Sequence, residues 1–233
     1  MIDAGTPQRL RGQAMVEFIV ILLVLWVLIF GIIQFALLYR AKITLNTAVF
    51  DAARVGAVNH GLRVAIGAEL VNRLLPLYYV APASGDRMDQ LMQDQQTYND
   101  TISKDLCIER VNPTQKMFQA LNESVDVGGK TYLVIPNDNL PYRNQSLSGV
   151  SIQDANLLKL RVMYCHTMIV PVISMMLKGA YDVTRAFVDS KKFAFGSSFA
   201  NACFAKDGFP LVSQAVVRMQ SAAWDDSFDT QCH

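Results

Sequence analysis

The sequence predicts an α+β fold in which one long N-terminal helix, membrane-spanning in its first half, packs on a small, largely antiparallel sheet. Three observations predict this fold: an apolar run over residues 14–38, apolar positions at helical spacing beyond that run, and strict alternation over residues 157–164. An amphipathic helix repeats its apolar residues about every 3.6 positions, whereas a half-buried strand repeats them every second position. With 233 residues, the chain can hold one membrane segment and one domain of ordinary size.

The apolar run is long enough to cross a bilayer. Between Ala14 and Leu38 the sequence has one charged side chain, Glu17, and one other strongly polar side chain, Gln34. A helix of about 25 residues rises roughly 37 Å, against a hydrocarbon core of about 30 Å. The run is too long for a secretory signal and no Ala-x-Ala break follows it, so we expect no cleavage after it. Basic residues are balanced on its two sides and give no orientation.

The helix is expected to continue beyond the membrane, as one element from about Gln13 to about Val58, roughly 69 Å long. The segment Asn59-His60-Gly61 is a typical helix stop. The second half carries an apolar, alanine-rich stripe, which we expect to pack on the chain's own domain, with a partner helix as the alternative. The stripe consists of Leu37, Leu38, Ala41, Leu45, Ala48, Val49, Ala52 and Ala53.

The remaining elements are expected from periodicity and from helix and strand breakers. We expect an exposed loop from Tyr78 to about Ser103, with room in it for a short helix. Pro171 interrupts the apolar segment Met168–Leu177, which is short, so we interpret it as core or loop packing instead of a second membrane helix. The patterns predict helices over Leu62–Leu75, ended by Pro76, and Asn112–Leu121, capped by Asn112 or Thr114, and strands over Lys130–Ile135, Leu157–Tyr164 and Leu211–Met219.

Glu17 is the anomaly of the apolar run. A carboxylate inside a membrane segment costs about 2.5–3.5 kcal/mol on insertion scales, and is by default a functional candidate that needs a partner. The alternative is an edge charge that extends its side chain to the interface.

Around Glu17 the chain resembles the type IV pilin superfamily, whose precursors carry a short basic leader ending in Gly and a Glu as fifth residue of the mature chain. Gly12 matches the last leader residue, Gln13 the new N-terminus and Glu17 the acid. More narrowly, RGQAMVEF, the run with FGIIQFALLYRAKITLNTAVFDAARVGA, and the later segments SIQDANLLKLRVMYC and PLVSQAVVRMQS are similar to TadE-like pseudopilins of tight-adherence (Flp, type IVb) pili. Phe18 stands where the major Flp pilins have Tyr.

The resemblance implies a role for each of these residues. A prepilin peptidase would recognise Gly12, Gln13, Glu17 and Phe18 and cut after Gly12 on the cytoplasmic face. The N-terminus would then be cytoplasmic and the C-terminal domain periplasmic, on a single-pass protein of the bacterial inner membrane that enters a surface pilus. Glu17 would neutralise its own Gln13 amine or that of a neighbouring subunit, and would be the charge that aligns subunits. The implied partners are the peptidase, other minor and major pilins, the inner-membrane assembly platform and the membrane.

Four cysteines, Cys107, Cys165, Cys203 and Cys232, all follow the membrane segment. An even number in an oxidising compartment predicts disulfides, with three possible pairings. We prefer Cys107 with Cys203 and Cys165 with Cys232, because the segments CIERVNP and CFAKDGFP are expected to flank the same sheet edge. Buried free thiols are the alternative.

No catalytic residue, cofactor or metal is expected. A net charge of +1 without a basic block argues against nucleic acid. The histidines His60, His166 and His233 have no triad spacing, and no CxxC or other zinc spacing occurs. The triplet Asn137-Asp138-Asn139 has oxygen ligands suited to calcium, although a plain turn is the preferred interpretation.

The organisation follows from these expectations: a prepilin leader at 1–12, the long helix at 13–58 with its membrane segment at about 14–38, and an extracytoplasmic α+β domain at 59–233. The resemblance implies a pilin-like, non-enzymatic protein, a minor pilin or pseudopilin that initiates, caps or regulates the assembly of a tight-adherence pilus and hence surface attachment. The alternative is a single-pass, membrane-anchored extracytoplasmic protein that binds a ligand and never enters a fibre. An anchored hydrolase is a third possibility.

Overall fold

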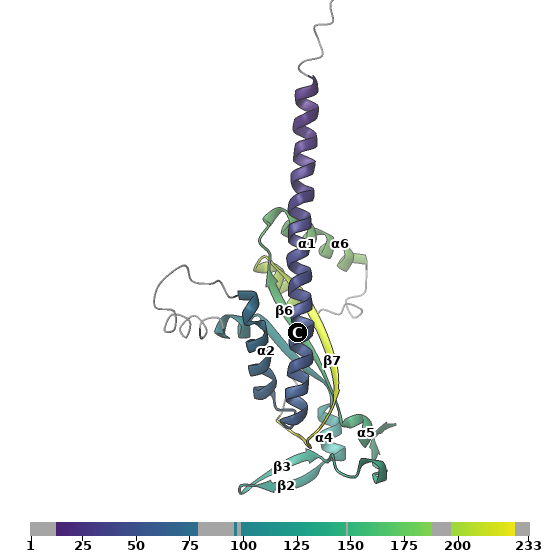
Figure 1. The fold of residues 1–233 in the computed structure, drawn as a ribbon. Helices are drawn as coiled ribbons and strands as arrows, with labels where there is room; N and C mark the ends of the chain where they lie inside the picture. Colours follow the sequence, from purple (N-terminus) through teal and green to yellow (C-terminus); the bar gives the residue numbers. More distant parts are fainter. Residues whose placement is uncertain (1–12, 79–95, 97–98, 148, 188–196, 227–233) are drawn as a thin grey trace, which may run out of the picture.

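A computed structural model describes residues 13–78, 96, 99–147, 149–187 and 197–226 (Figure 1). It confirms the α+β class, with a long N-terminal helix and small antiparallel sheets. In chain order the elements are α1 (Gln13–Val58), α2 (Arg63–Tyr78), β1 (Leu106–Asn112), α4 (Gln115–Leu121), β2 (Glu123–Val127), β3 (Lys130–Ile135), the 3-10 turn η1 (Leu140–Tyr142), β4 (Ser146–Leu147), β5 (Val150–Ser151), α5 (Ile152–Ala155), β6 (Leu157–Thr167), α6 (Pro171–Phe187), α7 (Ser197–Ala205), β7 (Gly208–Arg218) and β8 (Ala223–Trp224).

Helix α1 has the bounds that the sequence predicts, Gln13–Val58, and its two halves lie in different surroundings. The first half extends away from the rest of the chain, and the second half lies against α2, β6 and β7 (Figure 1). The alanine-rich stripe is buried there, which confirms that it packs on the chain's own domain. Its most buried members are Ala41, Leu45, Ala48, Val49, Ala52 and Ala53, together with Ala57.

The central sheet has the strand order β1-β6-β7, with both pairs antiparallel. Strand β6 lies in the middle, where Leu160 is opposite Arg110 of β1 on one side and Ala215 of β7 on the other. The alternation predicted for this strand is confirmed up to Val162, with Leu158, Leu160 and Val162 buried, but from there to Cys165 both faces are buried, including that of Met163. A second antiparallel sheet, β2-β3-β8, forms the end of the molecule farthest from the exposed half of α1 (Figure 1).

The turn after α1 ends the helix where the sequence predicts. His60 and Gly61 have φ values of 57° and 71°, the left-handed conformation that terminates many helices. The Gly61 N–H donates to the Gly56 carbonyl at 2.8 Å. His60 adopts this unfavourable conformation because its N–H donates to Ser221 Oγ at 2.9 Å and its ring stacks on Trp224, with centroids 4.2 Å apart.

Two helix boundaries differ from the prediction. Helix α2 continues past Pro76 to Tyr78, because a proline in the last turn removes one hydrogen bond while the Tyr78 hydroxyl accepts one from the Tyr164 hydroxyl at 2.5 Å. Thr114 is the N-cap residue of α4. Asn112, the other candidate, instead donates its side-chain amide to the Asp154 carbonyl at 2.8 Å.

The prediction for Met168–Leu177 is wrong in part. Met168 and Ile173 are buried, but Pro171 begins α6 and several apolar side chains of this segment are exposed. Proline suits the first helical position, since its φ is helical and the N–H there needs no helical partner. The strands β1 and β2 and the helix α7 lack a periodic signal strong enough to predict. The expected loop after Tyr78 lies partly outside the described residues, and residues 99–104 within it are helical.

Candidate functional site

The start of α1 holds the residues that the pilin resemblance singles out. Gly12 lies outside the described residues, and Gln13 is the first residue of the helix. Glu17 follows one helical turn later and is exposed, as is Phe18, with 64% of its surface accessible. Because residues four apart share one face of a helix, the Glu17 carboxylate and the Gln13 backbone lie on the same side of α1.

These residues lie at the start of the apolar first half of α1, which is called the stem below. It is long and apolar enough to cross a membrane, and no residue of its most apolar 18-residue window is buried by the described part of the chain. Side chains such as Ile21, Leu23 and Trp26 are more than half exposed. In water such a surface would cost about 1.5–3 kcal/mol for each large side chain. By its length and apolar surface, the first half of α1 is therefore suited to anchor the chain in a membrane.

Gln34 marks the junction between the stem and the domain. Its side chain is completely buried, and its Oε1 accepts hydrogen bonds from the N–H groups of Ile169 and Val170 at 3.3 and 3.1 Å. Those two residues directly precede α6. The sequence indicates Gln34 only as a polar residue in an apolar run. Its partners lie 135 residues or more away, where no local pattern points to them.

Two turns further along α1, Lys42 ties the helix to the sheet. Its Nζ donates to the Val212 carbonyl of β7. Burial lowers the pKa of Lys42, since the domain partly desolvates its ammonium group. Lys42 and Gln34 together determine the position of the domain along α1.

The cysteines pair differently from the prediction. Cys165 is bonded to Cys203, with Cα atoms 5.5 Å apart, so the expected pairings of Cys107 with Cys203 and of Cys165 with Cys232 are both wrong. The reason is that α7, which carries Cys203, packs on β7 and β6, and Cys165 lies close to the end of β6. Cys107 is also disulfide-bonded. Cys232 lies outside the described residues.

The turn considered for calcium is organised by an ion pair. Asp138 Oδ1 accepts a hydrogen bond from Arg143 Nη2 at 2.9 Å, and Asn139 adopts a left-handed conformation with φ 48°. Among the residues that the structure describes, no group of three His, Cys, Asp or Glu side chains could hold a metal ion.

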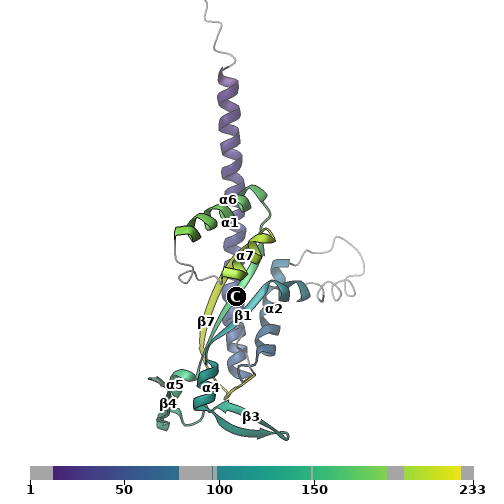
Figure 2. The same cartoon turned by 180° about the vertical axis from the view of Figure 1, so that it is seen from behind.

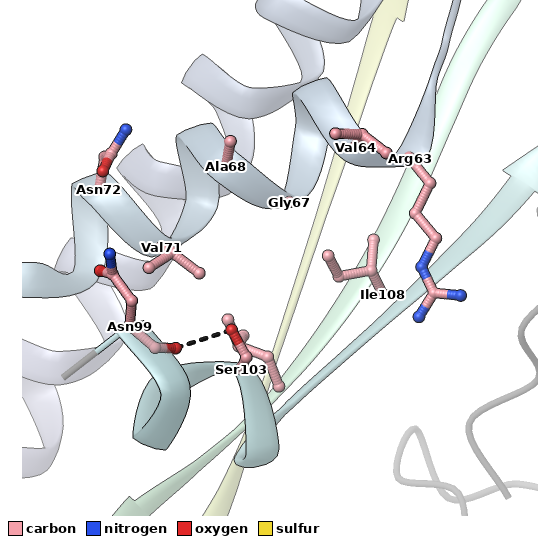
Figure 3. A pocket seen from close by; sticks show the side chains of 10 residues that line it. Arg63, Val64, Gly67, Ala68, Val71, Asn72, Asn99, Ser103 and Ile108 are labelled. Atoms are coloured by element: carbon pink, nitrogen blue, oxygen red, sulfur yellow. Dashed lines mark hydrogen bonds between the residues drawn. The ribbon is translucent and has the colours of Figure 1, made fainter. Parts of the chain in front are cut away.

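A hollow of about 480 Å³ lies between α2 and the segment that leads into β1 (Figure 3). Its floor and walls are mostly apolar, with Val64, Val71 and Ile108 turned toward it and Arg63 along its edge. Ser103 Oγ donates to the Asn99 carbonyl at 2.7 Å on the opposite wall. The hollow offers an apolar surface to a small molecule, and its polar groups there are those of Arg63, Asn72, Asn99 and Ser103.

Comparison with protein-family models matches residues 12–54 to a family described as TadE-like protein. The match covers nearly all of α1 and begins at Gly12, so the resemblance that the sequence indicates is confirmed over this segment. No curated protein and no solved structure matched the chain.

Proposed function

We propose, on the premise that residues 12–54 make this chain a TadE-like protein associated with the tight-adherence pilus, that it acts there as a minor pilin or pseudopilin. A prepilin peptidase cleaves it after Gly12, and the mature chain begins at Gln13. The protein takes part in initiating, capping or regulating pilus assembly and so in surface attachment. Its role is structural and not enzymatic.

One observation carries this proposal: Glu17 lies one turn from Gln13 at the start of an exposed apolar helix, and the domain contacts this helix from the level of Gly31 and Gln34 onward. After cleavage the Gln13 amine is a cation on the same helix face as the Glu17 carboxylate. The two groups can neutralise each other, or those of a neighbouring subunit, inside a low-dielectric bundle of such helices. Removing one partner of a desolvated ion pair typically costs about 3–5 kcal/mol, so the pair selects the aligned arrangement.

The domain supports a position at a filament end or in a priming complex. The central sheet and α2 pack against the second half of α1, and the β2-β3-β8 sheet lies beyond its end, which makes this part far wider than a single helix (Figure 1). The proposal puts the N-terminus in the cytoplasm and the domain outside the inner membrane. The oxidising periplasm would then form the Cys165–Cys203 disulfide. The partners are the peptidase, other pilins and the assembly platform.

The first experiment is the intact mass of the chain from cells with and without the prepilin peptidase. Wild type and a Gly5→Ala variant should lose residues 1–12 only when the peptidase is present, whereas Gly12→Ala should keep them. Gly5 is the matched control, because it is the other glycine of the same segment. Retention of residues 1–12 in every background would remove the basis of the proposal.

The role of Glu17 is tested separately by Glu17→Gln. Co-purification of the cleaved chain with other pilins should fall at least about tenfold if the pair contributes 1.4 kcal/mol or more. Because Glu17 is also an expected recognition residue, the intact mass of the same sample separates this loss from a loss of cleavage. Glu123→Gln, an exposed glutamate at the far end of the domain, is the control. Equal assembly of both variants would show that Glu17 is an edge charge.

A second candidate function rests on the hollow beside α2. A membrane-anchored extracytoplasmic protein that binds a small apolar ligand would use Val64, Val71 and Ile108 as its binding surface. This function predicts an uncleaved N-terminus together with a ligand whose binding Val71→Asp abolishes. A cleaved chain that assembles with pilins argues against it.

A further inference from the structure

Helix α6 runs crosswise to α1 at the level where the domain begins, in both views of the molecule (Figures 1 and 2). Two contacts hold its start there. The N–H groups of Ile169 and Val170 donate to Gln34 Oε1, and the Ile173 side chain lies beside Gly31, where an added Cβ would be in van der Waals contact with its Cδ1 at 3.9 Å. The position of α6 along α1 is therefore set between Gly31 and Gln34.

The outward face of α6 is apolar. Its exposed apolar positions follow the helical spacing i, i+3, i+4, i+7, i+8 and i+11, which makes one continuous stripe. Met175 and Met176 are 76% and 60% exposed, far more than an apolar residue of a domain core. The opposite face packs on the domain, where Tyr181 lies against Phe204 with ring centroids 4.6 Å apart. The α6 stripe consists of Val172, Met175, Met176, Gly179, Ala180 and Val183.

The height of α6 agrees with the edge of a bilayer. A hydrocarbon core of about 30 Å spans about 20 residues of helix, so a core that begins near Met15 ends near Phe35. That is the level of Gln34, to which the start of α6 is bonded. Tyr39, one turn beyond Phe35, is 69% exposed, and tyrosines are enriched at membrane interfaces.

The apolar surface of α6 is continuous with that of the stem. A cavity of about 510 Å³ lies between them, lined by Trp26 and Phe30 of α1 and by Val172 and Ile173 of α6, with almost no polar surface. Trp26 and Phe30 belong to the half of α1 that would lie in lipid. The cavity and the α6 stripe thus form one apolar surface with the membrane anchor, which is the surface that acyl chains would cover.

We propose that α6 is an interfacial membrane helix, with the α6 stripe in the outer acyl-chain boundary and Lys178 and Asp182 toward the headgroups and water. Amphipathic helices at such interfaces bury their apolar face about 5–10 Å below the headgroups. The helix then holds the domain against the membrane surface in a fixed orientation before any assembly. This inference rests on α1 being a membrane anchor and is independent of its entry into a pilus.

The test uses the full chain in phosphatidylcholine–phosphatidylglycerol vesicles, with a fluorescent label on one introduced cysteine. Met175→Cys probes the α6 stripe, Lys178→Cys is the matched control one turn further on the polar flank, and Ile21→Cys reports on the stem. Quenching by iodide measures exposure to water, and quenching by spin-labelled lipids measures contact with acyl chains. We expect iodide to quench the label at 175 about fivefold less than the label at 178, with lipid quenching in the opposite order.

Each other outcome overturns the proposal in a distinguishable way. Equal iodide quenching at 175 and 178, with the label at 21 in lipid, would leave α1 as the anchor and place α6 in water. Shielding at 175 that disappears when the protein is diluted in lipid would show that a second copy covers the α6 stripe. A label at 21 that is open to iodide would refute the anchor itself, whereas the mass experiment on Gly12 tests cleavage in cells independently.

Discussion

Arg110 Nη1 donates to Asp226 Oδ1 at 3.1 Å, although 116 residues separate the two in the sequence. The Arg110 side chain is 1% exposed and its guanidinium lies 4.8 Å from the centre of the Phe118 ring. The other carboxylate oxygen of Asp226 accepts from the Arg63 N–H, the first of α2, at 2.8 Å. One carboxylate therefore joins the start of α2 to the central sheet.

Replacing Asp226 should destabilise the domain. Asp226→Asn keeps the shape but removes the charge opposite a buried guanidinium, and hydrogen bonds to charged groups contribute about 1.5–3 kcal/mol. We expect a loss of that size in the free energy of unfolding by urea in detergent micelles. The control is Glu109→Gln. Glu109 Oε2 lies 3.2 Å from Arg161 Nη1, and the Arg161 side chain is 33% exposed, so the loss in the free energy of unfolding should stay below about 1 kcal/mol. Equal losses in the two variants would contradict the difference in burial.

The Cys165–Cys203 disulfide should limit what position 208 accepts. A Cβ on Gly208 would collide with the sulfur atoms of both cysteines and lie 3.2 Å from the Cys203 carbonyl oxygen. Gly208→Ala should therefore lower stability by about 1–3 kcal/mol, the usual cost of overpacking. The control is Gly179→Ala, since nothing lies within 4 Å of the added methyl group there.

Removing the disulfide tests the same contact from the other side. Cys165→Ala with Cys203→Ala should cost about 2–5 kcal/mol. In that background Gly208→Ala should cost less than in the wild type, because the two sulfur atoms are gone. Thermal unfolding followed by circular dichroism measures all four combinations, and strictly additive effects would show that the sulfur atoms are not the obstacle.

Gln34→Leu should loosen the start of α6 without unfolding the domain. The leucine fills the space but leaves the N–H groups of Ile169 and Val170 without their acceptor, a cost of about 1–3 kcal/mol for a buried donor. Gln34 Nε2 is buried and has no hydrogen-bond partner in the described residues. Its removal therefore offsets part of the loss in the free energy of unfolding of the domain. Hydrogen exchange at 169 and 170 should speed up about tenfold or more. Gln119→Leu, on the exposed face of α4, should leave exchange there unchanged.

Acidification should destabilise the domain through His166. Burial lowers the pKa of His166 below its usual value of 6.5, so the folded state resists protonation. The unfolded chain binds the proton first, and stability that is complete above pH 6.5 is lost as the pH falls below it. The free energy of unfolding then falls by at most about 1.4 kcal/mol per pH unit. His166→Gln should flatten the dependence of the melting temperature between pH 7.5 and 5, and an unchanged slope would refute this origin.

The sequence alone determined the elements whose cause is local. The bounds of α1 follow from an unbroken helical period and from the His60-Gly61 stop, and the bounds of β3 from a short run of strand-forming residues stopped by Pro136. The residues that begin the TadE-like segment, from Gly12 to Phe18, are recognisable because they are adjacent in the chain. In each case neighbouring residues carry the whole signal.

Only the tertiary structure decided which distant segments meet. Whether Cys203 reaches Cys107 or Cys165 depends on where α7 packs on β6, and the place where α6 begins depends on hydrogen bonds to Gln34, more than a hundred residues earlier. Both outcomes arise from hydrogen bonds and packing between segments that are distant in the chain, and the sequence of one segment does not indicate the other. Local periodicity tells that a face is apolar, whereas the fold decides whether protein or lipid covers it.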